Sequence, residues 1–556
     1  MMKRIDYANF SGGLHSVDNG MHCSMNELQM ADNINIKEGA IRKRHCLYQD
    51  TTGTTRAFFL LDILDKLNFS GNDKKLYING LQAHTYTTGG HGQFWVVSST
   101  QYCHSNGSDA MVEVFVGTPN YSNPVMGAPV SRVLFNHNDR CFCINGKVLY
   151  ETAVGTGPSS TVDNFAGGAT WTIGQDDKSI IGLGSIGRNL LIFKENSIYI
   201  QAGYTKNERQ TYLLTDSYGC LSVDSIKNVN VPGIGECVIF LSEGRKLCLA
   251  TLTGVVDIGG KVQDVLDSVY YGVCAHEPAG TNVHKHRARG AVLANGNYVL
   301  SIADVVTDDY ATWDTALYVN LNEQGLPITK WVTTSEADTC PVGFMTISDA
   351  GHTASSLIKE SFICIPQLAL DGTFNGTDFT TAQLVEDPSF DFDRYQDRLI
   401  DSGGFTHEYW IYFRFQTRDE DCGDKHIVKT FYELLAQVGC QNGPVGYFSG
   451  FPLTISQEID SDLTTYEKYS PTWAWPAPIV YNEPFDDWLQ GYASAIYPYT
   501  TLMNRFVYEG KHNLAGAGKQ TSLIFKSYKT TAVRTSNGGN PTIKSIAILY
   551  TNGNIE

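Results

Sequence analysis

An acidic cluster beginning at residue 391 is the first place where residue types and spacing could support chemistry. Asp391, Asp393 and Asp397 could bind a cation, or supply the paired carboxylates that hydrolyse a glycosidic bond. The EF-hand pattern requires glycine at the sixth loop position, where Gln396 stands. Glycosidase carboxylates are defined by their separation in space, which a sequence does not give. We therefore expect an exposed acidic turn, with sugar chemistry as the alternative.

Two histidines form a second candidate site. His284 and His286 alternate, so on a strand both imidazoles would lie on one face and could bind a metal ion. No third ligand follows at a regular spacing, and the neighbouring Lys285, Arg287 and Arg289 would repel a divalent cation. The pattern favours a basic interface loop.

Aromatic residues are concentrated in a proline-rich segment near residue 480. Trp473, Trp475 and Trp488, together with Tyr481, could form a platform on which sugar rings stack. Such side chains more often bury a loop or a protein interface. We therefore interpret Trp473 and Trp475 as candidate interface residues and keep carbohydrate binding as the alternative.

A glycine-rich run from Gly182 to Gly187 matches the dinucleotide fingerprint G-x-G-x-x-G. That site requires the glycines to open a helix whose N-terminus faces a pyrophosphate. Here they precede the strand-like run Leu190–Phe193, so a turn between strands is expected. The sequence contains no H-E-x-x-H, P-loop or G-x-S-x-G motif. We predict no catalytic residue, cofactor or bound metal, and hence no enzyme activity.

The elements that would position these residues are short strands. Two hairpin units follow one another from Ile180 to Gly260, and Asn79-Gly80, Asn145-Gly146 and Asn295-Gly296 each separate two apolar runs. Asn-Gly tolerates positive φ at both turn positions, which makes it a strong hairpin signal. The runs recur at roughly 50 residues, the length of a four-stranded propeller blade. We predict an all-β chain with a β-propeller over residues 56–390.

Residues 1–55 are predicted to form an N-terminal arm with a platform strand. Met25–Ala31 could be helical, and a strand is expected over Ile34–Ile36, followed by a turn at Lys37–Gly39.

A basic cluster, Arg42, Lys43 and Arg44, follows this turn. It is either a solvated strand end or an interface patch for an acidic partner, because three cations alone are a weak signal for nucleic acid. We treat these three residues as candidate interface residues.

Residues 391–556 are predicted to form a second, β-rich platform or nozzle domain. A strong strand is expected over Tyr409–Phe415, and the acidic run Asp419–Asp421 should be a solvated hairpin tip. The stretch Lys425–Val438 fits either a helix, by its apolar periodicity, or a strand pair, by its β-branched residues. Further strands are expected at Arg505–Tyr508, Ser522–Tyr528 and Ile543–Tyr550.

Charge and composition restrict the function classes. The chain has 556 residues, 42% of them hydrophobic, and is long enough for two or three domains. Its net charge of −17 argues against a groove that grips nucleic acid, because such a groove needs a basic patch. An acidic wall that repels phosphate would instead suit a conduit through which DNA passes.

The 13 cysteines are scattered between Cys23 and Cys440 without a C-x-x-C pair. We expect buried free thiols in a protein made in a reducing cytosol. Cys141 and Cys143 would share one strand face, too close together for a zinc-ribbon knuckle. The sequence begins without the apolar core of a signal peptide, and no apolar run approaches the ~18 residues of a membrane helix. We expect no membrane-spanning segment.

Motifs between Phe10 and Gly260 resemble those of one protein family. The similarity is carried by NLLIFKENSIYI, YGCLSVDSIKNV and VIFLSEGRKLCLA, and by Gly12-Gly13, Asn26-Glu27, Asn33, Glu38-Gly39, Arg42 and Arg44. In these features the chain resembles tail tubular protein B, that is, the nozzle and packaged-DNA-stabilisation family of short-tailed bacteriophages. It departs from the family pattern at His45-Cys46, where Pro-Gly often follows the basic cluster, and in its high cysteine content.

The resemblance implies a structural protein of the virion tail, assembled in the host bacterial cytoplasm. Such a subunit would form a ring, expected to be a homohexamer, below a portal and its adaptor. The ring would extend the DNA channel, retain packaged DNA, conduct it on ejection without sequence-specific binding, and carry fibres or receptor-binding proteins. Six copies would carry a charge of about −102. The alternatives are a carbohydrate-binding or carbohydrate-degrading propeller acting on the host surface, and an intracellular scaffold.

Overall fold

The chain is built almost entirely of β-strands, with one short α-helix, α1 (Gln263–Asp267), among the described residues. A computed structural model describes residues 2–17, 22–44, 47–52, 57–60, 66–70, 74–78, 81–88, 93–98, 101–115, 117, 121–125, 127–131, 133–138, 140–152, 165, 167–269, 288–293, 296–307, 310–332, 342–346, 360–366, 382–386, 396–400, 406–410, 412–423, 426–441, 453–459, 462–468, 506–514, 517–527 and 540–552. The predicted all-β class is confirmed. Within the described part of the chain, no helix is long and apolar enough to cross a membrane.

Five four-stranded antiparallel sheets follow one another along the chain, each built from four consecutive strands. The first contains β7 (Ala57–Leu60), β8 (Lys66–Ser70), β9 (Lys75–Ile78) and β10 (Leu81–Thr85), and the second β11 (Gln93–Ser98), β12 (Gln101–Ser105), β13 (Val112–Phe115) and β14 (Tyr121–Pro124). The third contains β15 (Leu134–His137), β16 (Arg140–Asn145), β17 (Val148–Glu151) and β18 (Ala169–Thr172), and the fourth β19 (Ile180–Ile186), β20 (Asn189–Lys194), β21 (Ile198–Ala202) and β22 (Gln210–Thr215). The fifth contains β23 (Lys227–Val231), β24 (Gly235–Leu241), β25 (Leu247–Ala250) and β26 (Val255–Asp257).

Two more groups of four antiparallel strands continue the series within larger sheets. The sixth group is β27 (Ala288–Val292), β28 (Tyr298–Thr307), β29 (Tyr310–Val319) and β30 (Ile328–Val332). The seventh is β31 (Val342–Thr346), β32 (Glu360–Pro366), β33 (Ala382–Glu386) and β6 (Leu47–Thr52), with β34 (Gln396–Ile400) and β35 (Thr406–Trp410) beyond β6. The strand β6 is therefore contributed by the segment that immediately precedes the first sheet.

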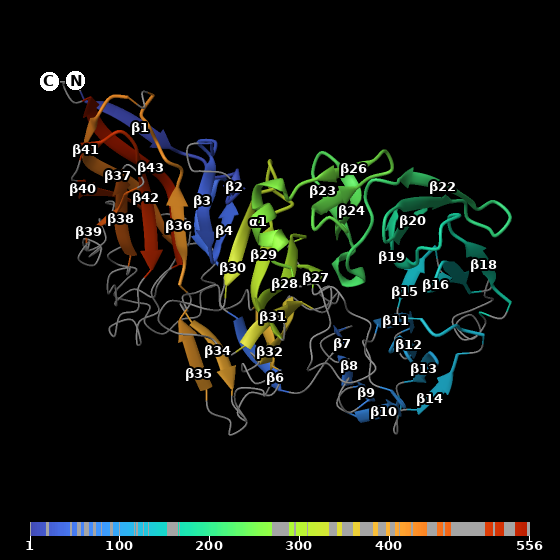
Figure 1. Cartoon of the computed structure of the whole chain (residues 1–556). Helices are drawn as coiled ribbons and strands as arrows, with labels where there is room; N and C mark the ends of the chain where they lie inside the picture. The colour runs from blue at the N-terminus through green and yellow to red at the C-terminus, as the bar shows by residue number, and fades with distance from the viewer. Residues whose placement is uncertain are drawn as a thin grey trace, which may run out of the picture.

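Consecutive sheets are neighbours in space. The first strands β11, β15, β19, β23, β27 and β31 form a series in which each contacts the next. In Figure 1 the colour runs in order through these groups, from the blue β7–β10 past the green β19–β26 to the yellow β28–β30. The contacts are apolar: the rings of Phe193 on β20 and Phe240 on β24 lie 4.9 Å apart in a shared core. Apolar cores of this kind bury the facing sides of neighbouring sheets.

The glycine-rich run of residues 182–187 serves this packing. Gly182 and Gly184 lie within the strand β19, and the chain turns at Gly187 (φ 55°) into β20. A Cβ on Gly184 would lie 3.0 Å from the methyl carbons of Val238 in the next sheet. The expected turn is confirmed only at Gly187; the rest of the run lies within β19, where its glycines permit close approach of two sheets.

The remaining strands form two larger sheets. The sheet of the sixth group continues from β30 through β3 (Glu27–Asp32), β36 (Arg414–Thr417), β42 (Thr521–Ser527) and β38 (Leu453–Ile459) to β39 (Asp462–Lys468), with β2 (Gly13–Leu14) beside β3. The other contains β4 (Ile34–Lys37), β5 (Ala40–Lys43), β43 (Asn540–Asn552), β37 (Lys429–Gln441) and β40 (Phe506–Asn513), with β1 (Lys3–Tyr7) on β43 and β41 (Ala517–Gly518) on β37. Phe415, Phe525, Leu434 and Ile548 from these two sheets share one core, so they form a sandwich.

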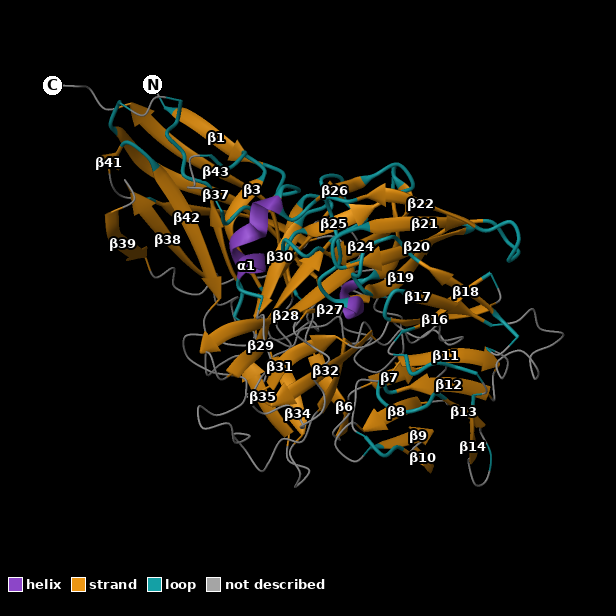
Figure 2. Ribbon diagram, turned by 45° about the vertical axis from the view of Figure 1, so that its right-hand side comes forward, coloured by secondary structure: helices purple, strands orange, loops and turns teal. Residues whose placement is uncertain are grey.

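Both ends of the chain build this sandwich. All five residues of β1 pair with β43, and both strands lie at the left of Figure 1. The core of the sandwich is continuous with that of the fifth and sixth groups, and α1 lies between the two regions in Figure 2. The predicted N-terminal arm is thus paired with strands of the predicted C-terminal domain.

Three local predictions need correction or completion. The helix considered for Met25–Ala31 is wrong, because the stretch enters the strand β3 at Glu27, and β3 pairs with β30 on one side and β36 on the other. The single strand expected at Tyr409–Phe415 is two strands, β35 and β36, in different sheets. The stretch Lys425–Val438 contains the strand β37, held between β43 and β40.

The predicted hairpins are confirmed by their pairing. Ile78 pairs with Leu81, Asn145 with Val148, and Val292 with Tyr298. The cysteines also follow the expectation: of the eight whose side chains the structure describes, seven are buried, all eight are free, and Cys422 is half-buried. Burial raises the pKa of the Cys237 thiol to about 11.

Asn33, between β3 and β4, connects several segments at the junction between the sandwich and the sixth group. It is buried, with φ 54°, and its N–H donates to the Lys330 carbonyl at 2.7 Å. Its side-chain amide donates to the Tyr412 carbonyl at 2.7 Å, and Oδ1 accepts from Arg44 Nε and Val332 N–H, both at 2.9 Å. One side chain thereby ties the end of β3 to the residue after β5, to β30 and to the segment before β36.

Replacing Asn33 with alanine should destabilise the chain by about 3–5 kcal/mol, because several buried partners lose their hydrogen bonds and positive φ is retained. Chemical unfolding followed by tryptophan fluorescence would measure this. Asn138→Ala is the matched control, since Asn138 is a partly exposed asparagine at φ 51°, and it should cost about 1 kcal/mol. Equal losses in the two variants would contradict the assigned role.

Candidate functional site

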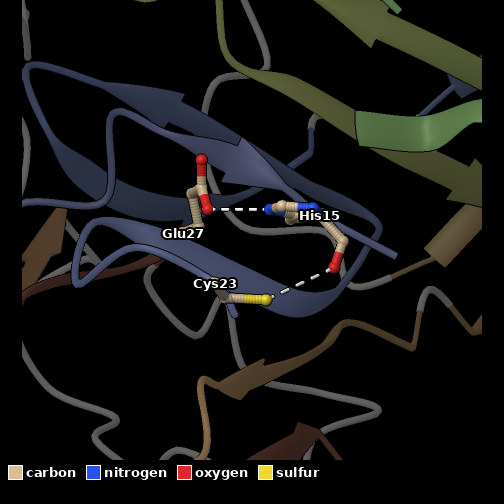
Figure 3. A group of neighbouring side chains, drawn as sticks. All are labelled: His15, Cys23 and Glu27. Atoms are coloured by element: carbon tan, nitrogen blue, oxygen red, sulfur yellow. Dashed lines mark hydrogen bonds and ion pairs between the residues drawn. The ribbon is translucent and has the colours of Figure 1, made fainter. Parts of the chain in front are cut away.

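A largely buried group of three side chains that can bind a metal lies near the start of the chain. His15 follows β2, Cys23 lies in the loop that returns toward β3, and Glu27 begins β3 (Figure 3). One imidazole nitrogen, the sulfur and one carboxylate oxygen all lie within 4.8 Å of one another. The parallel pairing of Gly13 with Glu27 brings the two ends of this loop together.

Glu27 is the centre of the hydrogen bonding in this group. Its Oε2 lies 2.8 Å from His15 Nδ1 and accepts the Ser24 N–H at 2.7 Å, while Oε1 lies 2.7 Å from Lys261 Nζ. Burial favours the neutral acid, but the hydrogen bonds from His15, Lys261 and Ser24 outweigh it and lower the pKa of Glu27 to about 2. Glu27 is therefore a carboxylate at neutral pH.

Backbone contacts from distant segments hold the group in place. The N–H of His15 donates to the Leu28 carbonyl at 2.8 Å, and that of Ser16 to the Lys261 carbonyl at 2.9 Å. Arg418 Nη1 donates to the Cys23 carbonyl at 3.1 Å. Three parts of the chain, more than a hundred residues apart in the sequence, therefore meet at this site.

The arrangement is suited to binding a cation or to forming a buried hydrogen-bond network, and not to nucleophilic attack. The Cys23 thiol donates to the His15 carbonyl at 3.7 Å, and Cys23 is 2% exposed, so a substrate does not reach the sulfur. His15 Nδ1 is engaged by Glu27. Sequence analysis missed this group because its spacing matches no ligand motif and Lys261 joins it only through the fold.

The predicted basic cluster lies mostly inside the protein. Lys43 and Arg44 are 4% and 1% exposed, and only Arg42 is partly exposed. The Arg44 guanidinium lies 5.9 Å from the centre of the Trp331 ring, and Lys43 Nζ donates to the Arg44 carbonyl at 3.1 Å. A solvated strand end therefore does not describe Lys43 and Arg44; both are part of the junction around Asn33.

Other predicted site residues lie outside the described residues: Trp473, Trp475, Trp488, Tyr481, His284, His286, Asp391 and Asp393. Asp397 is described only as part of the strand β34. The expected solvated acidic tip at Asp419–Asp421 needs correction, because Glu420 is 5% exposed. Its Oε2 accepts from Arg418 Nη2 at 2.6 Å, so the charge is buried in an ion pair.

A second buried charged group lies between the third and fourth sheets. Glu151 Oε1 accepts from Arg140 Nη1 at 2.7 Å and from Arg209 Nη2 at 2.6 Å, and the side chains of Glu151 and Arg209 are completely buried. Burial lowers the pKa of Arg209, while the Glu151 carboxylate opposes that shift. The guanidinium of Arg209 also lies 5.0 Å from the Phe142 ring centre. This group fixes one sheet against the next.

Comparison with known proteins adds little to these observations. No protein-family model and no curated protein matches the chain. Among solved structures, the chain is similar to the WD40 β-propeller domain of Doa1, at 10% sequence identity and a TM-score of 0.26. That match covers 53% of this chain and 93% of the other. A likeness at this score carries no argument about architecture or function.

Glu27→Gln should lower the free energy of unfolding, by an amount that depends on pH. Because folding lowers the pKa of Glu27 from its usual 4.5 to about 2, the carboxylate stabilises the fold fully above pH 4.5 and loses this effect as the pH falls toward 2. At pH 7 we expect a loss of about 1–2 kcal/mol, reduced by the exposure of Lys261.

Urea unfolding at pH 7, 5 and 3 would measure the difference in the free energy of unfolding between the unaltered chain and the variant. The difference should be largest at pH 7 and shrink at pH 3. Glu208→Gln, which changes an exposed glutamate, is the control. A difference that stays constant with pH would contradict the role of Glu27.

Glu151→Gln should cost about 3–5 kcal/mol, since two buried guanidinium groups lose their counter-charge. Thermal unfolding would detect it. The control is Asp177→Asn, which breaks an ion pair between Lys147 and a completely exposed carboxylate and should leave the unfolding midpoint unchanged. A small effect of Glu151→Gln would mean that the carboxylate is not needed at this junction.

Proposed function

We propose that the chain is a structural virion protein, a subunit of a bacteriophage tail nozzle or hub ring. The observation that supports this proposal best is the order of the sheets. Seven groups of four antiparallel strands are neighbours in chain order, and the seventh takes β6 from the segment just before the first. This arrangement supports a closed β-propeller with an attached sandwich platform.

The chain connection supports closure of the propeller. The strand β6 ends at Thr52 and β7 begins at Ala57, so five Cα–Cα steps separate the seventh group from the first. A fully extended chain covers at most about 18 Å in five steps. The end of β6 and the start of β7 are therefore at most about 18 Å apart, which is less than two of the ~10 Å distances between stacked sheets.

A propeller joined to a rigid platform is suited to ring assembly. Heterologous head-to-tail contacts need two different faces on each subunit, which a propeller and a sandwich can supply. We propose a homohexamer that binds a portal-adaptor protein on one side and tail fibres or other tail proteins on the other.

The charge of the chain suits a DNA conduit. With 58 acidic and 41 basic residues, a ring of such subunits repels phosphate if part of this charge faces the lumen. DNA would then pass without sequence-specific binding. The buried carboxylates Glu27 and Glu151 accept hydrogen bonds from cationic side chains and serve as structural anions, which is consistent with a protein without enzyme activity.

Electron microscopy and native mass spectrometry of the purified chain test this proposal. We expect rings of about six copies, alone or on addition of a portal–adaptor complex. A monomer that releases reducing sugar from capsule or cell-wall polysaccharide would favour the carbohydrate-active alternative. In that case Asp391→Asn or Asp393→Asn should abolish the release, while Asp177→Asn should not.

A further inference from the structure

We propose that His15, Cys23 and Glu27 form a zinc-binding site. Imidazole nitrogen, thiolate sulfur and carboxylate oxygen are the three donor types that Zn²⁺ accepts in proteins. Cys23 and Glu27 are buried and His15 is partly exposed, so the three donors form a largely enclosed group with one side near solvent.

The distances are close to those of a tetrahedral site. Bonds of about 2.0–2.3 Å to zinc separate two ligand atoms by about 3.3–3.8 Å in a tetrahedron. Here the three ligand atoms lie within 4.8 Å of one another, and His15 Nδ1 lies 2.8 Å from Glu27 Oε2. Zinc would therefore need the histidine and glutamate atoms to separate by about 0.5 Å, and the sulfur to move toward the other two ligand atoms by at most about 1 Å.

The donor set favours zinc over the hard cations. Ca²⁺ and Mg²⁺ need six or more oxygen ligands, and this group offers one carboxylate among its three donors. The thiol of Cys23 and the imidazole of His15 select a borderline metal. A water molecule would complete four-coordination.

The contacts of Glu27 leave its Oε2 atom facing His15, where a metal ion would lie. Lys261 is bound to Oε1, whereas Oε2 faces His15 and also accepts the Ser24 N–H. These contacts orient the carboxylate as outer-shell partners do in known zinc sites. On binding, Cys23 loses its proton to solvent and the His15 proton moves to Nε2. The thiolate and the carboxylate then neutralise the ion, and Lys261, which is 45% exposed, stays hydrated.

Zinc at this site would brace the connection between the sandwich and the sixth group. The strand β3, which begins with Glu27, pairs with β30 and β36, and β2, which precedes His15, pairs with β3. The metal would join the two ends of the loop between β2 and β3.

Zinc content of the purified full-length chain tests the proposal. After incubation with ZnCl₂ and desalting, bound zinc is measured by mass spectrometry for the unaltered chain and for Cys23→Ala and His15→Gln. Because other residues among the 13 cysteines and 14 histidines can also bind zinc, the test compares the zinc content of each variant with that of the unaltered chain. Each variant should bind one equivalent less. With Co²⁺ as probe, the thiolate-to-cobalt absorption should lose intensity in Cys23→Ala.

Cys422→Ala is the matched control, because Cys422 is half-buried beside the carboxylate of Glu420. It should bind as much zinc as the unaltered chain. Equal zinc in Cys23→Ala and the unaltered chain, or a loss confined to Cys422→Ala, would overturn the proposal. Circular dichroism checks folding, and if Cys23→Ala does not fold, His15→Gln and Glu27→Gln decide the outcome in the same way.

Discussion

The junction around Asn33 is the constraint on which the rest of the structure depends. A buried asparagine in the left-handed region satisfies two backbone groups and the guanidinium of Arg44 at once. The Trp331 ring covers that guanidinium and donates its own N–H to Asn35 Oδ1 at 3.0 Å. These bonds add side-chain contacts to the backbone pairing of β3 with β30 and β36, at the point where the sandwich joins the series of sheets.

Buried charged side chains also join segments of the chain at other junctions. Glu151 joins β17 to the segment before β22, and Lys194, buried on β20, pairs with Asp176 in the segment before β19. A buried ion pair contributes little net stability, because desolvation offsets the attraction, but an incorrect alignment leaves a charge unpaired at a large cost. Such pairs therefore specify which sheet lies against which, while the apolar cores between them supply most of the stability.

This division of labour suits the proposed role. A subunit that closes a ring around DNA must keep its shape while its neighbours and its cargo exert force on it. Interdigitated sheets, a platform made from both chain ends, and buried ionic contacts all resist relative movement of the parts. The net charge of −17 would keep a polyanion from adhering if part of it faces the lumen.

The sequence by itself determined the local elements of this protein. Asn-Gly turns and alternating apolar runs predict hairpins from neighbouring residues alone, which is why the all-β class and the repeated four-stranded units were predictable. Tertiary structure decided what those elements touch. Met25–Ala31 became the strand β3 because strands distant in sequence lie on both of its edges, and tertiary pairing overrides a weak local preference.

The same physics explains the site residues. The sequence suggests that Arg44 is a surface cation, yet it is buried. Its guanidinium donates a hydrogen bond to Asn33 and lies over the ring of Trp331, which is nearly 300 residues away in the sequence. His15, Cys23 and Glu27 form a group only because β2 and β3 pair in parallel and Lys261 reaches them from another segment. Turn chemistry is encoded within a few residues, whereas burial of a charge depends on partners that only the folded chain brings together.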